Sequence, residues 1–189
     1  MALKLRRLKA SLASWRDFWI GAAGEREVLL AATPPCRGRK AAITCLEQTL
    51  RRLLGVRVIL EVDEREQLAS KVVKLLEGKA KPPRFSLEHV SPFVEKVCMT
   101  TLAIPRGKVT SYREIAKKIG YPRAVRAVGR ALAANPLPIV IPCHRVIRSD
   151  LSLGGYAGGV KVKKLLLEVE GVSIVDGRVR EDCFLALSS

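Results

Sequence analysis

The sequence is poor in the residues that metal sites and secreted scaffolds require. It has two histidines and no Cys-x-x-C pair among five cysteines, so no metal site is expected. An odd number of cysteines and no recognisable secretion signal favour an intracellular protein with mostly free thiols. No apolar run reaches the roughly 20 residues that a membrane-spanning helix needs. We therefore expect a cytoplasmic protein that binds neither a metal nor a membrane.

Acidic residues are also scarce, which points to a polyanionic partner. The chain of 189 residues carries 34 Lys and Arg against 18 Asp and Glu, a net charge of +16. Nucleic acid is the commonest partner of so basic a protein. The charge is concentrated in residues 106–130, where the only acid is Glu114 and the basic residues are Arg106, Lys108, Arg113, Lys117, Lys118, Arg123, Arg126 and Arg130. This segment has the composition of a phosphate-binding surface.

Side-chain amides are nearly absent, and this bears on the cysteines. One Asn and two Gln are typical of a thermophile, where intracellular disulfides do occur. A disulfide between Cys36 and Cys45 is therefore left open. Cys98 and Cys183 are interpreted as small buried residues.

The segment Gly78–Ser86 contains two prolines and predicts a linker between domains 1–85 and 86–189. Apolar residues at positions 5, 8, 12, 15 and 19 predict a helix over residues 1–20, laid on the core or, alternatively, on a membrane surface. Strands are predicted near 28–33 and 56–62, and helices near 41–54 and 65–77. The first domain is thus predicted to be a small α/β unit with a three-stranded sheet.

The second domain is predicted to be mostly helical. Ser91-Pro92 begins a helix that ends before Pro105. Ser111 and Glu114 have the spacing of a capping box, which begins a helix ending near Gly120. A further helix is predicted over 123–134. Two short basic helices joined by a Gly-containing turn are typical of a helix-turn-helix, although an ordinary helical hairpin with a basic surface has the same pattern.

Cys143 follows a proline-rich apolar segment, 137–141, which is predicted to be extended and buried. A Gly-rich loop follows at 154–159, and a last helix, 160–170, is closed by Gly171. Only a thiolate attacks well, and a base oriented by a third group would generate it. His144 is the candidate base and Glu170 the candidate orienting carboxylate. A chance Cys-His pair at a buried thiol is the alternative.

Several blocks of the second domain, all in order and spacing, resemble one family. They are Gly107–Tyr112, Arg126–Gly129, Ala134–Pro136, Ile141–Val146 and Gly155–Gly159, followed by Lys163 and Glu170-Gly171. Over residues 90–172 the chain is similar to the O6-alkylguanine-DNA alkyltransferases. The resemblance implies a winged-helix-like helix-turn-helix with an active-site loop. It also implies a monomeric DNA-repair protein that acts once, as a suicide enzyme, without a cofactor.

The resemblance implies a role for each matched residue around the thiol. Cys143 would accept the alkyl group, His144 would relay its proton through a water, and Glu170 would hold His144. Tyr112 would rotate the nucleotide at its phosphate and protonate the departing guanine. The pocket would be completed by Asn135 at the turn, Lys163, the carbonyl of Val146, Tyr156 and Ala157. Ala157 departs from members that carry serine, so only its backbone N–H remains for the guanine oxygen.

The resemblance also implies double-stranded DNA as the partner, bound through the minor groove. Arg126 would fill the gap left by the flipped guanine, and Ala127 and Gly129 would allow close approach to the groove. Arg130, which replaces a glycine of some members, would contact a phosphate or point away, and Ser111 would lie at the same interface. Simpler roles stay open: Tyr112 as a core aromatic, Arg126 as one phosphate contact among many, Asn135 as a helix cap and Lys163 as a solvated charge.

Two other functions are compatible with parts of this pattern. An alkyltransferase-like protein recognises the lesion without removing it, but such proteins lack the cysteine that Cys143 provides here. A helix-turn-helix transcription regulator could use Cys143 as a redox or methylation sensor. It would bind a specific sequence in undamaged DNA.

Overall fold

The computed structural model describes residues 5–63, 65 and 67–187. The chain divides into two compact units. Unit 1 holds the chain up to Val90 together with Pro136–Val140, and unit 2 holds Ser91–Asn135 and the chain from Ile141 onward. No helix of the described residues is long and apolar enough to cross a bilayer.

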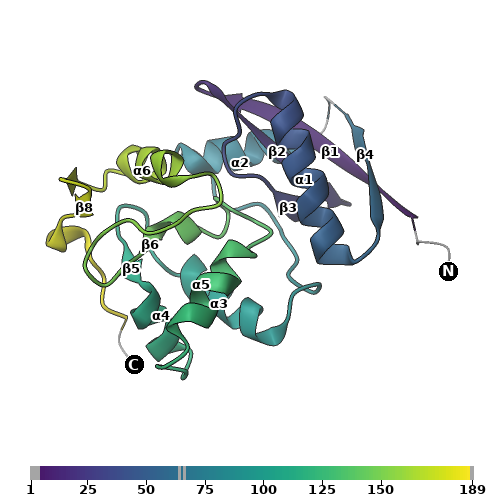
Figure 1. The fold of residues 1–189 in the computed structure, drawn as a ribbon. Helices are drawn as coiled ribbons and strands as arrows, with labels where there is room; N and C mark the ends of the chain where they lie inside the picture. Colours follow the sequence, from purple (N-terminus) through teal and green to yellow (C-terminus); the bar gives the residue numbers. More distant parts are fainter. Residues whose placement is uncertain (1–4, 64, 66, 188–189) are drawn as a thin grey trace. The chain divides into compact units, whose positions relative to one another are not determined.

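Unit 1 is a four-stranded sheet with two helices (Figure 1). Its strands are β1 (Leu5–Trp15), β2 (Phe18–Glu25), β3 (Val28–Ala32) and β4 (Arg57–Val62), and its helices are α1 (Arg39–Leu54) and α2 (Leu68–Leu76). The strand order is β3-β2-β1-β4, with β1 antiparallel to β2 and parallel to β4. The segment 136–140 joins this unit because the Ala32 amide donates to the Pro136 carbonyl at 2.9 Å.

Successive side chains of β1 point to opposite faces of the sheet, and the two helices contact different faces. Leu8 and Ala10 pack in one core with Leu46 and Leu50 of α1. Ser11 projects from the other face, as neighbouring strand residues do, and its hydroxyl accepts a hydrogen bond from the Ala69 amide in the first turn of α2 at 2.9 Å. The strand therefore supplies the cap that the helix lacks, because Gln67 at the N-cap makes no side-chain capping bond.

The predicted N-terminal helix is wrong over its described residues, and residues 1–4 lie outside them. Residues 5–25 form a β-hairpin with a tight turn at Arg16 and Asp17, where Arg16 has φ 52°. The residues around Leu8 and Ala10 alternate with exposed Arg7 and Lys9, a period-two signal, and pairing with two neighbouring strands outweighed the helical spacing. The predicted three-stranded sheet is wrong for the same reason, because the hairpin brings the sheet to four strands.

Unit 2 is mostly helical. Its longer helices are α3 (Pro92–Leu102), α4 (Tyr112–Lys118), α5 (Val125–Ala133) and α6 (Val160–Val169). Two-residue strands form two small sheets: β5 (Thr110–Ser111) pairs with β6 (Val146–Ile147), and β7 (Ile174–Val175) with β8 (Arg178–Val179). Single 3-10 turns lie at η1 (Cys143–Arg145) and η2 (Glu181–Cys183). The helices agree with the sequence prediction to within a few residues.

Two local predictions, at Ser111 and at residues 137–141, need correction. Ser111 caps α4 by accepting from the Glu114 amide, but the Glu114 carboxylate accepts from Lys117 and from the Leu187 amide, so the capping box is only half formed. The segment 137–141 is buried as predicted but is not extended throughout. It turns at Ile139, which has φ 76°. Proline restricts itself and the residue before it, so the prolines at 136, 138 and 142 left Ile139 free to turn.

We expect Ser11→Ala to lower the free energy of unfolding by about 1–2 kcal/mol, because a buried amide at the start of α2 loses its acceptor. Urea unfolding followed by circular dichroism measures this. Ser14→Ala, at an exposed position of the same strand, is the control and should change little. Equal stability of the Ser11 and Ser14 variants would contradict the cap.

Candidate active site

Cys143 borders a cavity of about 320 Å³ inside unit 2. The turn η1 begins at this residue, and its amide donates to the Ile141 carbonyl at 2.8 Å. The Asn135 side chain donates to the same carbonyl at 2.9 Å and so holds the approach to the turn. The cavity is lined by Tyr112, Gly129, Leu132, Ala133, Cys143, Gly155, Tyr156 and Ala157. The thiol is thus buried but adjoins a space that a planar ring can enter.

Burial raises the pKa of the Cys143 thiol, and this rise is opposed by a hydrogen bond from Asn135 and by the charge of Lys163. The thiol is therefore protonated at neutral pH, and a base must take its proton when the sulfur attacks.

His144 is the buried base nearest in the chain. Its Nε2 lies 3.1 Å from Oε1 of Glu170, and the side chain is fully buried. Burial lowers the pKa of His144, although the Glu170 carboxylate opposes the shift, so the ring is neutral at pH 7. A neutral ring that donates from Nε2 to a carboxylate keeps a lone pair on Nδ1. Within the described residues Nδ1 has no hydrogen-bond partner, so it is available to accept a proton.

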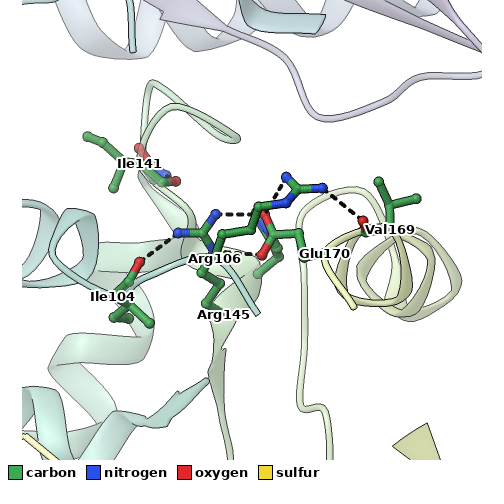
Figure 2. Close-up of polar contacts among 8 residues, drawn as sticks. Ile104, Arg106, Ile141, Arg145, Val169 and Glu170 are labelled. Atoms are coloured by element: carbon green, nitrogen blue, oxygen red, sulfur yellow. Dashed lines mark hydrogen bonds and ion pairs between the residues drawn. The ribbon is translucent and has the colours of Figure 1, made fainter. Parts of the chain in front are cut away.

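The Glu170 carboxylate is held by two arginines besides His144 (Figure 2). Arg145 binds it through two hydrogen bonds of 2.7 Å and also donates to the Ile104 carbonyl at 2.6 Å. Arg106 donates to the Val169 carbonyl at 2.8 Å and lies 3.9 Å from the carboxylate. Burial alone would raise the pKa of Glu170, but the hydrogen bonds from His144 and Arg145 lower it to about 2. The carboxylate is therefore ionised and fixed in direction.

Lys163 is a fully buried cation beside the cavity. Its ammonium donates to the Val146 carbonyl at 2.6 Å and to the Gly155 carbonyl at 3.3 Å, and it lies 5.9 Å from the centre of the Tyr112 ring. These contacts join the strand after Cys143 to the Gly-rich loop. Burial lowers the pKa of Lys163 to about 8, opposed by its interaction with Cys143.

Tyr112 and Tyr156 form the aromatic part of the cavity wall. Tyr112 is the first residue of α4, directly after the cap Ser111. Burial raises the pKa of the Tyr112 phenol, Cys143 raises it further, and the positive charge of Arg148 opposes the shift. The phenol of Tyr112 is therefore a proton donor rather than a phenolate at neutral pH. Tyr156, the other aromatic residue, packs edge-on against the His144 ring, with the ring centres 6.4 Å apart.

Helix α5 has a buried apolar side and an exposed basic side. Val128, Ala131 and Leu132 are buried in the core of unit 2. Arg126 and Arg130, one helical turn apart, are exposed. A Cβ atom added at Gly129 would meet no atom within 4 Å, so the backbone there is open to a close partner. Ala127 is half-buried beside it.

The structure brings most of the predicted site residues together, on the cavity or just behind it. Arg126, Ala127 and Arg130 lie on α5 outside the cavity lining, and Ser111 lies at the cap of α4. The sequence pattern did not predict a role for Arg145, although this residue follows His144 in the Ile141–Val146 block. The signal was the predicted orienting carboxylate of Glu170, which needs a cationic partner when it is buried. Leu132 and Ala133 were also missed, because helix spacing alone does not reveal which residues border a cavity.

Cys36 and Cys45 are free thiols, so the disulfide left open by the sequence is not formed in this structure. Both are half-buried in unit 1.

Residues 92–172 match the model of the 6-O-methylguanine DNA methyltransferase, DNA binding domain. The inducible methylated-DNA--protein-cysteine methyltransferase of Bacillus subtilis is 40% identical over 125 residues, which cover 66% of this chain and 70% of that protein. The chain spans about half the length of several other curated relatives that it matches.

Solved structures of the same kind match both units. The O6-methylguanine-DNA methyltransferase from the hyperthermophilic archaeon Pyrococcus kodakaraensis has a TM-score of 0.74 and 30% identity, covering 87% of this chain and 99% of that one. The Mycobacterium tuberculosis OGT in complex with DNA has a TM-score of 0.68 and 30% identity, covering 86% and 92% of the two chains. The resemblance found in the sequence is therefore confirmed.

The buried ammonium of Lys163 predicts a particular pH dependence of stability. Its pKa is about 8 in the folded chain, against 10.5 as the ordinary value, so between these pH values the unfolded state binds more protons. The free energy of unfolding of the wild type should therefore rise relative to that of Lys163→Met as pH increases from about 8 to 10.5.

Urea unfolding at several pH values measures the difference between the two curves. Lys161→Met, at an exposed position of the same helix, is the matched control and should follow the wild type. If the free energies of unfolding of the wild type and of Lys163→Met changed with pH in parallel, the lowered pKa of Lys163 in the folded chain would be refuted.

Proposed function

The chain belongs to the family of methylated-DNA--protein-cysteine methyltransferases, and we propose that it repairs alkylated DNA by transferring the alkyl group of O6-alkylguanine to Cys143. The observation that carries this proposal is the position of the Cys143 thiol. It borders a cavity of about 320 Å³, with the His144–Glu170 pair held beside it. A thiol nucleophile, a neutral base and an ionised orienting group are the parts that nucleophilic displacement by sulfur requires.

In the reaction the sulfur forms a bond to the alkyl carbon while the bond from that carbon to the guanine oxygen breaks. The thiol proton passes to Nδ1 of His144 through a water, since this nitrogen is the free acceptor of the pair. Glu170 stabilises the imidazolium that forms, and Arg145 keeps Glu170 ionised and oriented. His144 is thus the base, and Glu170 and Arg145 are positioning residues.

The departing guanine leaves as an anion and needs a proton. Tyr112 supplies it, because its phenol is protonated at neutral pH and lines the same cavity as Cys143. Tyr156 and Ala157 line the same cavity, where the backbone N–H of Ala157 would donate to the guanine oxygen. The Val146 carbonyl accepts from Lys163 and, with its second lone pair, from the guanine amino group. Asn135 holds the Ile141 carbonyl just before Cys143, and Lys163 joins Val146 to Gly155 of the Gly-rich loop.

The substrate base lies inside a stacked duplex, so the protein must flip it out. We propose that α4 and α5 form a winged-helix-like helix-turn-helix that binds the minor groove. Arg126 fills the gap in the duplex, and the small residues Ala127 and Gly129 allow close approach of α5. Arg130 is exposed and would contact a phosphate, whereas Ser111 is buried at the cap of α4 and would act at the interface only by holding the start of that helix.

The product is a thioether, which thiols do not reverse. Each molecule would therefore act once. We further propose that it acts as a monomer and without a cofactor, in the cytoplasm and, in a prokaryote, in association with the nucleoid.

We expect Cys143→Ala to abolish alkyl transfer while binding to duplex DNA is retained, since the thiol takes no part in the basic surface. The test is intact-mass analysis after mixing with a duplex containing O6-methylguanine. The wild type should gain one methyl group, on the peptide that contains position 143.

Cys98→Ala is the control for this experiment. Cys98 is buried, and burial raises its pKa to about 12, so this thiol is inert and its removal should leave transfer intact. A methyl group that stays on the DNA in the presence of wild type would identify a lesion-binding protein instead. Loss of DNA binding in the Cys143 variant would make the cysteine structural.

Arg126→Ala should slow repair of the duplex at saturating DNA by about tenfold or more, because filling the gap offsets part of the few kcal/mol that base flipping costs. The reaction with free O6-benzylguanine should keep its rate, since a free base needs no flipping. Single-turnover kinetics on both substrates measure the ratio.

Arg130→Ala, one turn along the same exposed face, is the matched control. It should weaken DNA binding but leave the saturating rate unchanged. Equal losses of the Arg126 variant on the duplex and on the free base would refute the gap-filling role.

A further inference from the structure

Arg148 stands next to Tyr112 because of the register of two short parallel strands. In the β5–β6 pair, Thr110 is opposite Val146 and Ser111 is opposite Ile147. Tyr112 and Arg148 are the residues that directly follow these two strands, so the pairing brings their backbones close together. Because the two strands are parallel, their C-terminal ends lie at the same edge of the sheet, and so do the residues that follow them.

Two observations place the Arg148 side chain at the Tyr112 phenol. A Cβ atom built on Gly154 would lie 3.4 Å from Cγ of Arg148 and 3.4 Å from the Tyr112 hydroxyl oxygen, so both side chains border the same point. Gly155, the next residue, lines the cavity. The positive charge of Arg148 also acts on Tyr112, whose pKa it lowers against the effect of burial. The Arg148 side chain therefore lies close to the Tyr112 hydroxyl, next to the part of the cavity lining that Tyr112 and Gly155 form.

The backbone of Arg148 is fixed, whereas its charged group is exposed. Its amide donates to the Ser152 carbonyl at 2.9 Å and its carbonyl accepts from Leu151 at 3.1 Å, which closes a tight turn. The Asp150 carboxylate in this turn accepts hydrogen bonds from the amide and the hydroxyl of Ser152, at 3.0 and 2.6 Å. In the part of the chain that the structure describes, the Arg148 guanidinium has no ion pair. An exposed guanidinium without an ion pair, carried on a fixed backbone, is a ready site for a phosphate.

We propose that Arg148 binds the DNA phosphate next to the extruded nucleotide and so positions that nucleotide over Tyr112 and Cys143. This inference rests on the proposed function, because it assumes that a flipped guanine enters the cavity. A guanidinium fits the purpose because it binds a phosphate through two parallel hydrogen bonds and fixes orientation as well as distance. Arg148 is a positioning residue: it touches the backbone of the substrate, not the reacting atoms.

The test compares Arg148→Ala with the wild type on two substrates, a duplex containing O6-methylguanine and free O6-benzylguanine. On the duplex the second-order rate constant should fall about tenfold, and the slope of log K for duplex binding against log salt should become shallower by about 0.9, the value of one phosphate contact. On the free base, which has no phosphate, the rate should be unchanged. Arg148→Lys should recover the salt slope and part of the rate.

Arg178→Ala is the matched control, since Arg178 is an exposed arginine of the same unit, bridged to Ser152 in the same turn. It removes an equal charge and should change neither the rate nor the slope. Equal losses in the two variants would reduce the effect to general charge and overturn the proposal. So would an unchanged duplex rate in Arg148→Ala, or an equal loss on the free base. Failure of the wild type to transfer any alkyl group would instead refute the proposed function itself.

Discussion

The ionised carboxylate of Glu170 is the constraint on which the site depends. It is buried, so it persists as an anion only because Arg145 binds it at two points and His144 donates to it. The same contact leaves Nδ1 of His144 free to accept a proton, beside a thiol whose pKa is raised by burial. Removing the carboxylate would leave the half-buried Arg145 guanidinium without its ion pair and the His144 ring without its orienting partner, so structure and chemistry would both be affected.

The parts around this carboxylate are held by short local devices rather than by a large sheet. Glu170 is the C-cap of α6, and Lys163, two turns earlier on the helix, binds the carbonyls of Val146 and Gly155. The two-residue strands β5 and β6 end directly before Tyr112 and Arg148, whose side chains both lie near Gly154. Each device fixes one segment relative to another, and together they hold the thiol, the phenol and the imidazole around one small volume.

The sequence predicted the helices of unit 2 well because their signals are local. Ser91-Pro92 and Ser111 cap the helices that they were expected to begin, and Glu170 lies beside His144 as the motif suggested. The N-terminal hairpin was mistaken for a helix, since Leu8, Leu12 and Trp15 satisfy a helical spacing while strand pairing is a non-local interaction. The turn at Ile139 was missed because neighbouring prolines constrain other residues than this one.

By itself, the sequence determined the basic surface, the order of the helices and the residues of the Cys143 motif, because composition, caps and motif spacing are read along the chain. Only the tertiary structure decided that Arg145 and Arg106 gather on Glu170, that Leu132 and Ala133 border the cavity, and that Arg148 meets Tyr112. These contacts join residues that chain folding brings together from distant positions. Their energy comes from burial and charge in a shared space, which no spacing within one segment encodes.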